Sequence, residues 1–211
     1  MRAVAVILAL LVVGPAAWTQ DEAVRQPLAP GVAAPDFTAN TLDGATIKLT
    51  DWRGKVVLLN FFVTWYRDAA QHLKMLEDLS TAFSEQGMRL VSISLDEGQV
   101  GLDAVRAVIA DQGIAHPVIM DPAQQIAAPY GVRILPAIFI IGRDGVITNY
   151  HEGYAEGDDE RLGELIAAAL QVGAEAEPST EAQAEAEPAA EPEEPAQPEE
   201  PVCKCFRQEA E

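Results

Sequence analysis

The sequence predicts an α/β fold in which a central mixed β-sheet is flanked by helices. Three observations predict it. Val56 to Val63 is a nearly unbroken apolar run rich in β-branched and aromatic residues, as expected for a strand buried on both faces. Soon after it, Leu73, Leu76, Leu79 and Phe83 recur at helical steps. A second strand pattern and a second helix pattern follow, and this order favours parallel strands joined by right-handed crossovers.

An N-terminal hairpin extension is predicted ahead of the central strand. From Ala34 to Lys55, apolar and polar residues alternate around Asp43-Gly44, a dipeptide typical of hairpin turns. Residues 21–33 are polar and contain proline, so they form a lead-in without a structural signal of their own.

The remaining elements follow from apolar periodicity and from glycines that end helices. The helix after the central strand is expected over about residues 66–86, and Gly87 ends it. Pro136 stands at the start of a strand, where its missing N–H does no harm. The later elements are a strand at Met88–Leu95, helix Leu102–Gln112, a short strand within 116–121, helix Ala123–Tyr130, strand Ala137–Ile141, an antiparallel strand at Val146–Glu152 and helix Glu160–Val172.

Residues 1–20 have the pattern of a secretory signal peptide. Arg2 precedes an apolar run from Ala3 to Val13, and small residues follow. The run is shorter than the ~20 residues that a membrane span needs, although a retained anchor is the alternative. Cleavage between Ala16 and Gln20 would release a mature chain, without a membrane span, outside the cytoplasm.

Residues 174–201 are low in complexity and predict a disordered linker. They contain ten glutamates and no basic residue among alanine, proline and glutamine, so they have little apolar surface to bury. The terminal segment 202–211 follows. The formal net charge of the whole chain is −19, and residues 21–173 alone carry 21 acidic and 11 basic side chains. Nucleic acid and anionic lipid are therefore poor partners.

The segment from Asn60 to Lys74 resembles the active-site segment of thioredoxin-like thiol-disulfide reductases of the TlpA/ResA type. In that family a strand ends in tryptophan, and Cys-x-x-Cys then opens a helix. Further matches are Pro35-Asp36-Phe37, Asp43-Gly44, Gly54-Lys55 and the Gly131-Val132-x-x-x-Pro136 pattern. The resemblance spans about residues 34–170 and implies a thioredoxin-like fold over 34–173.

The cysteine positions of the resembling motif are occupied by Tyr66 and Ala69, in the tetrapeptide Tyr66-Arg67-Asp68-Ala69. Disulfide exchange needs one thiolate to attack a sulfur and a second thiol to resolve the mixed disulfide. A phenol and a methyl group do neither. The family's helix proline is replaced by Lys74, and its acidic residue by His72. Whether the chain is an enzyme is therefore open. The family that it resembles consists of thiol-disulfide oxidoreductases, but the usual active site of that family is absent here.

The resemblance also implies a groove for polypeptide. Pro136 corresponds to a cis-proline that faces the Cys-x-x-Cys turn and presents backbone to a bound peptide. We expect Trp65, Tyr66, Arg67, Leu135 and Pro136 to form this groove, with a polypeptide client or a redox partner protein as its occupant. The leading hypothesis is an exported, periplasmic binding or accessory module in protein maturation.

Only Cys203 and Cys205 can perform thiol chemistry, and three hypotheses for this pair stay open. The two cysteines could form an inert or intermolecular disulfide, a redox pair on a tether, or a weak Cu(I) site. The end-to-end distance of a flexible linker is ~5–6 Å times the square root of its number of residues. This linker would therefore reach across a domain. No cofactor is predicted, and no His/Cys/Asp spacing fits zinc. His72 is expected to be solvated, although it could flank the groove, and His116 to be structural.

Overall fold

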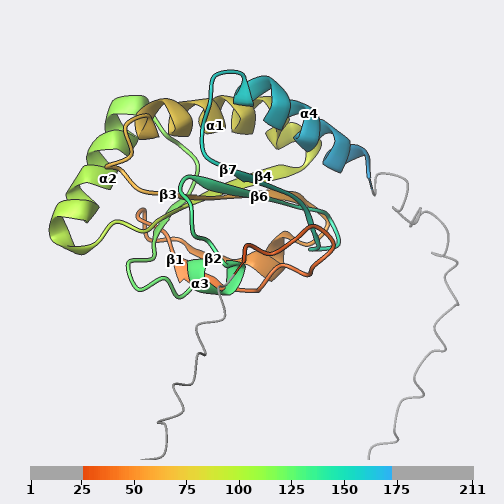
Figure 1. The fold of residues 1–211 in the computed structure, drawn as a ribbon, viewed down its shortest axis with the longest axis horizontal. Coiled ribbons are helices and arrows are strands. Elements are labelled where there is room, and N and C mark those ends of the chain that lie inside the picture. Colours follow the sequence, from red (N-terminus) through yellow and green to blue (C-terminus); the bar gives the residue numbers. More distant parts are fainter. Residues whose placement is uncertain (1–25, 173–211) are drawn as a thin grey trace, which may run out of the picture. The chain divides into compact units, whose positions relative to one another are not determined.

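The computed structural model describes residues 26–172, which form a five-stranded mixed sheet between two layers (Figure 1). The strand order is β5-β4-β3-β6-β7, with β3 at the centre. The sheet strands are β3 (Val56–Phe62), β4 (Met88–Ser94), β5 (Val118–Met120), β6 (Ala137–Ile141) and β7 (Ile147–Glu152). Strands β3, β4 and β5 are parallel, whereas β6 and β7 run antiparallel to their neighbours. The predicted mixed α/β sheet is confirmed.

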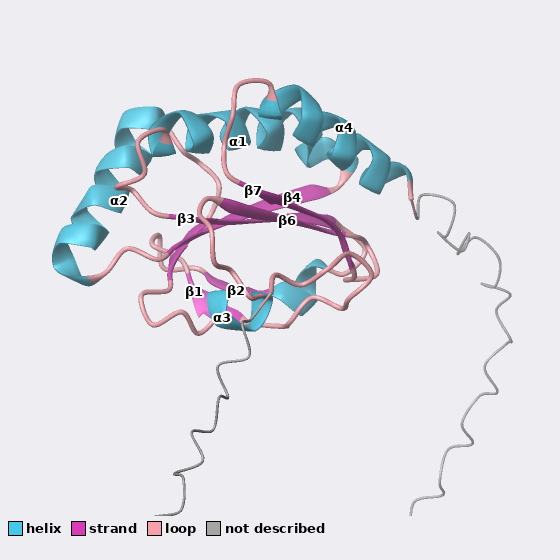
Figure 2. Ribbon diagram, viewed as in Figure 1, coloured by secondary structure: helices cyan, strands magenta, loops and turns pink. Residues whose placement is uncertain are grey.

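Helices cover one face of the sheet, and the hairpin with a short helix covers the other (Figure 2). On the first face lie α1 (Ala69–Phe83), α2 (Gly98–Gln112) and α4 (Asp158–Gln171). On the second lie the hairpin of β1 (Thr38–Asn40) and β2 (Thr46–Lys48), and α3 (Ala127–Tyr130). Two 3-10 turns, η1 (Leu49–Trp52) and η2 (Ser84–Gln86), connect elements. Among the described residues, no helix is long and apolar enough to span a membrane.

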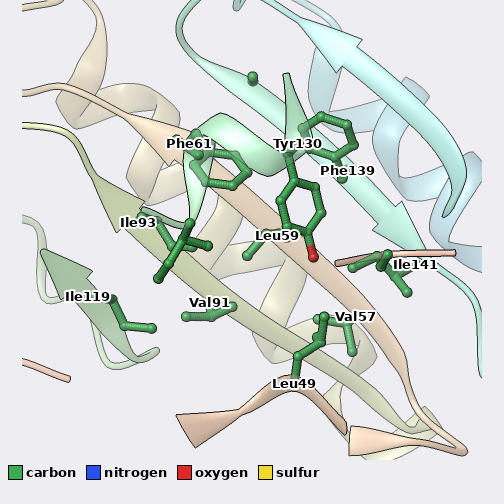
Figure 3. Close-up of a cluster of buried hydrophobic side chains, with 14 of the residues drawn as sticks. Leu49, Val57, Leu59, Phe61, Val91, Ile93, Ile119, Tyr130, Phe139 and Ile141 are labelled. Carbon is green, nitrogen blue, oxygen red and sulfur yellow. The ribbon is translucent and has the colours of Figure 1, made fainter. Parts of the chain in front are cut away.

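Every residue of β3 is buried, which confirms the prediction of a strand covered on both faces. Its alternate residues Val57, Leu59 and Phe61 enter the cluster on the hairpin side, while Val56 and Leu58 pack with α1 and α4. On the hairpin side Phe61, Tyr130 and Phe139 form an aromatic group (Figure 3). Its ring centroids lie 5.2–5.9 Å apart, within the range of favourable aromatic pairs.

Helices α2 and α3 begin four residues from their predicted starts, whereas α1 and α4 begin within three residues of theirs. Helix α2 starts at Gly98 rather than Leu102, because its first turn projects toward solvent and lacks the apolar period. Helix α3 starts at Ala127 rather than Ala123, because the Asp121 carboxylate accepts the backbone N–H groups of residues 125, 126 and 127. Those backbone N–H groups donate to a side chain and not to helical carbonyl groups, so the segment before α3 forms a loop.

Candidate functional site

The turn after β3 is fixed by one buried carboxylate. Asp96 follows β4, the parallel neighbour of β3, and accepts hydrogen bonds from the Thr64 backbone N–H at 2.8 Å and the Thr64 hydroxyl at 2.7 Å. The Ser94 hydroxyl donates to the same carboxylate at 2.8 Å. Since the carboxyl ends of parallel strands meet at one edge, Asp96 is placed to hold the turn. Asp96 directly follows the predicted strand Met88–Leu95, and no motif in the sequence marks it as part of the site.

Beyond Thr64 the chain makes a tight turn into α1. The Tyr66 N–H donates to the Val63 carbonyl at 3.4 Å, and the Ala69 N–H donates to the Tyr66 carbonyl at 3.0 Å. Asp68 occupies the N-cap of α1. Ala69 therefore opens the first turn of the helix, and Tyr66 lies two residues before the N-cap, close to the unpaired amides that carry a partial positive charge.

Leu135 and Pro136 lie beside this turn. Antiparallel pairing of β3 with β6 sets Phe61 opposite Ala137, so the residues after β3 and the residues before β6 leave the sheet at the same edge. The Leu135-Pro136 peptide bond is cis. Pro136 is buried, and its carbonyl accepts the Gly153 N–H at 2.8 Å.

An open groove of about 910 Å³ runs from the turn to α2, and we call it the α2 groove. Its apolar walls are Val63, Trp65, Leu95, Val100, Val108 and Leu135. Trp65 is 78% exposed and Val100 is 84% exposed, unusual values for large apolar side chains. Exposed apolar side chains gathered in a hollow are typical of surfaces that bind another molecule.

Only two of the five residues predicted to form the binding groove line the α2 groove. Trp65 and Leu135 line the α2 groove, but Tyr66, Arg67 and Pro136 do not. Arg67 is exposed and its Nε lies 3.5 Å from an Asp68 carboxylate oxygen. The wall contributed by α2 was not predictable from the sequence, because only the tertiary fold brings that helix to the turn.

Gly101 allows the first turn of α2 to lie close against Asp96. A Cβ at this position would lie 2.8 Å from the Asp96 Cβ and 3.1 Å from the Asp96 carbonyl carbon. Real side chains do not tolerate such contacts, so a larger residue would push the first turn of α2 away. The absence of a side chain here thus lets the first turn of α2 lie against Asp96, the residue that holds the turn after β3.

We expect Gly101→Ala to lower the free energy of unfolding by about 1–3 kcal/mol, because the added methyl group overlaps Asp96. Urea denaturation measures this change. The matched control is Gly163→Ala in α4, where the nearest heavy atom to the new Cβ is 3.8 Å away. That variant should be more stable by about 0.5–1 kcal/mol, because alanine favours helix. Equal effects of the two substitutions would contradict the close approach at Gly101.

A chain of buried hydrogen bonds runs beneath the turn. His72 Nε2 lies 2.9 Å from the Asn60 side-chain oxygen, and the Asn60 amide nitrogen donates to the Ser92 hydroxyl at 3.1 Å. Ser92 Oγ lies 2.9 Å from His116 Nε2, and His116 Nδ1 lies 2.6 Å from the Glu77 carboxylate. Asn60 and Ser92 are paired in register on β3 and β4.

This chain of hydrogen bonds has one direction. Because the amide nitrogen of Asn60 donates to Ser92, its oxygen accepts, so the His72 proton is on Nε2. The Ser92 hydroxyl then donates to His116, which donates to Glu77. His72 Nδ1 is left as a buried acceptor without a partner among the described residues.

The prediction of a solvated His72 is wrong. The side chain is 1% exposed, and its ring packs edge-on against Tyr154 with centroids 5.4 Å apart. Burial, opposed by the Asp158 charge, lowers the pKa of His72 from 6.5 to about 4. His116 is buried, and Glu77 accepts hydrogen bonds from its ring and its backbone N–H, as expected for the predicted structural role. Burial lowers the pKa of His116.

A second hollow of about 650 Å³ lies between α1 and the loop from β7 to α4. Tyr154, Lys74 and Asp159 are among its lining residues. It contains none of the residues that the sequence predicts for the site. Three or more histidine, cysteine or carboxylate side chains placed to share a metal ion do not occur between residues 26 and 172. Cys203 and Cys205 lie outside the described residues, as do the predicted signal peptide and linker.

Comparison with known proteins agrees with this geometry. The sequence matches the AhpC/TSA family over residues 30–150, more than half of the chain. The chain belongs to the AhpC/TSA family. This family member is 31% identical over 145 residues to the thiol-disulfide oxidoreductase ResA of Bacillus anthracis, covering 67% of this chain and 82% of the relative. The ResA of Geobacillus thermodenitrificans is 28% identical over 159 residues, covering 75% and 90%.

Solved structures give the same assignment for this AhpC/TSA family member. A putative thiol:disulfide interchange protein DsbE from Chlorobium tepidum superposes with a TM-score of 0.63 at 30% identity, covering 68% of this chain and 99% of that one. A putative protein disulfide isomerase from Bacteroides thetaiotaomicron gives 0.63 at 28% identity, covering 71% and 94%. The thioredoxin-like fold and the resemblance to ResA-type reductases are confirmed.

Proposed function

We propose that this protein is an exported polypeptide-binding module that has kept the groove of its thiol-disulfide oxidoreductase relatives and lost their reaction at the usual turn. The observation that carries the proposal is the turn itself. It opens α1 beside Leu135 and an apolar groove, yet positions 66 and 69 hold tyrosine and alanine. Without sulfur at these positions, neither the attacking nor the resolving step of disulfide exchange is available there.

Binding at the α2 groove draws its free energy from apolar burial. Trp65 and Val100 expose large apolar surfaces next to Leu135, and covering such surface contributes about 25 cal/mol per Å². An extended client segment would lie across these side chains. We propose that the client is an unfolded or partly folded polypeptide in the compartment outside the cytoplasm, as an accessory to protein maturation.

Export is part of the proposal and is supported by the apolar run from Ala3 to Val13 behind Arg2. Cell fractionation that leaves the protein in the cytoplasm would contradict it. The thiol-exchange and Cu(I) alternatives for Cys203 and Cys205 stay predictions, because the pair lies outside the described residues.

Binding of a reduced and carboxymethylated unfolded protein tests the function. We expect Val100→Asp to weaken this binding at least about tenfold, because a carboxylate would be desolvated among apolar walls. The matched control is Val172→Asp, at a valine that is 71% exposed at the end of α4. It should bind as the parent does. Fluorescence anisotropy of the labelled unfolded protein measures both affinities.

An insulin-reduction assay completes the test. We expect no activity from the mature protein or from its Cys203→Ala/Cys205→Ala variant. Activity that the double substitution abolishes would reject a binding-only module in favour of an oxidoreductase using those cysteines. Failure of the parent to bind any unfolded polypeptide would reject the binding function itself.

A further inference from the structure

The α2 groove combines its apolar walls with two features that attract a cation. Resting on the polypeptide-binding function, we propose that the groove selects client segments in which an arginine, or less tightly a lysine, stands among apolar residues. The cation would lie against the indole of Trp65 and beside the carboxylate of Glu97, and both residues line the groove.

Trp65 provides the first feature. Its side chain is 78% exposed, so most of the indole surface is free to contact a client. The face of an indole carries negative electrostatic potential, and tryptophan is the best of the aromatic side chains for binding a cation. An apolar client side chain would use the same surface, but only a cation gains the electrostatic attraction.

Glu97 provides the second feature. It is exposed at the N-cap of α2 and its side chain makes no capping hydrogen bond. Among residues 26–172 it has no ion-pair partner within 4 Å. The amides that open α2 contribute about half a positive charge, which does not cancel a full carboxylate. Glu97 therefore leaves net negative charge at the groove.

The neighbouring charges do not replace a client cation. Asp96 also lines the groove, but its oxygens already accept from Thr64 and Ser94. Arg67, the cation of the same turn, contacts Asp68 and is not part of the groove lining. The planar guanidinium of arginine can stack on an indole while it donates to a carboxylate, and it is less strongly hydrated than the lysine ammonium. The geometry thus favours arginine.

The experiment compares short labelled peptides that differ only at one central position within an apolar sequence, which is arginine, glutamine or glutamate. Fluorescence anisotropy gives each dissociation constant. We expect the parent protein to bind the arginine peptide about tenfold more tightly than the glutamine peptide, the sum of an exposed cation–aromatic contact and an exposed ion pair. The glutamate peptide should bind more weakly than either.

Two variants locate the selectivity and one controls for net charge. Glu97→Gln and Trp65→Leu should each reduce the preference for arginine over glutamine to about threefold, and leucine preserves apolar area at position 65. Glu85→Gln removes the same charge beyond the C-terminal end of α1, outside the groove lining, and should keep the tenfold preference. A preference that falls equally in Glu85→Gln would mean general attraction to an acidic protein and would overturn the proposal.

Failure of this inference is separable from failure of the function. If arginine and glutamine peptides bind the parent equally, and Val100→Asp weakens the binding of both, then the groove binds polypeptide without selecting a cation. If no peptide binds, the polypeptide-binding function also falls.

Discussion

Tyr66→Cys/Ala69→Cys is expected to convert a protein that does not reduce insulin into one that does. The substitutions are made in a Cys203→Ala/Cys205→Ala background, so that no other thiol contributes. The Ala69 N–H already donates to the Tyr66 carbonyl, which brings the two positions together at the start of α1. Relatives named thiol-disulfide oxidoreductases are 28% and 31% identical to this chain.

The physical reason is the helix N-terminus. A free thiol has a pKa near ~8.5, and the amides that open a helix lower it into the range of about 3.5–7.5. The thiol introduced at position 66 should therefore be largely thiolate at neutral pH and attack a disulfide, and the thiol at position 69 should resolve the product. Insulin turbidity with excess dithiothreitol measures the rate, and the pH dependence of alkylation measures the thiol pKa.

The control is Tyr66→Ser/Ala69→Ser, which should be as inactive as the parent. A folded double-cysteine variant whose thiol keeps a pKa near ~8.5, and which reduces no insulin, would contradict the assignment of the reactive turn. Mass spectrometry after mild oxidation checks separately that the two introduced thiols form a disulfide. If they form it and the thiol pKa is lowered, the geometry of the turn is established independently of the substrate.

Acidification from pH 6.5 to pH 4 is expected to cost the fold about 3 kcal/mol through His72 alone. Burial lowers the pKa of His72 from 6.5 to about 4. In that window the unfolded chain binds a proton that the folded protein excludes, so the free energy of unfolding rises with pH and falls as pH drops. The lowered pKa of His116 acts in the same direction.

Urea denaturation between pH 4 and pH 7.5 measures the slope. His72→Gln should flatten it by about one proton, because glutamine does not titrate and its amide can still donate to Asn60. His151→Gln, at a half-buried histidine of β7, serves as the control for removing a histidine nearby. Equal slopes for the parent and His72→Gln, or an NMR titration of His72 near pH 6.5, would refute the burial argument.

Much of the fold was readable from apolar periodicity. The run at Val56–Phe62 is apolar on both faces because β3 is covered on both faces, and glycines at 87 and 113 end their helices in the left-handed conformation. The starts of α2 and α3 were not readable. The first turn of α2 is solvated and so has no apolar period, and the amides before α3 are satisfied by Asp121.

Only part of the candidate site could be predicted from the sequence. Trp65 and Leu135 were found through a local motif, and their proximity follows from the pairing of β3 with β6. Asp96, Glu97 and Val100 belong to the same site but carry no motif. Their one available signal was position, since they follow β4 at the sheet edge where β3 also ends.

The sequence by itself determined the chemistry that is absent from the turn, because the identity of an atom at positions 66 and 69 is covalent and independent of folding. It also determined the sheet layer, since periodic burial is a local property of strands and helices. Only the tertiary structure decided that His72 is buried and that α2 forms one wall of the groove. Both depend on distances between segments far apart in the chain. Strand register and helix packing set these distances, and they produce no periodic pattern in the sequence.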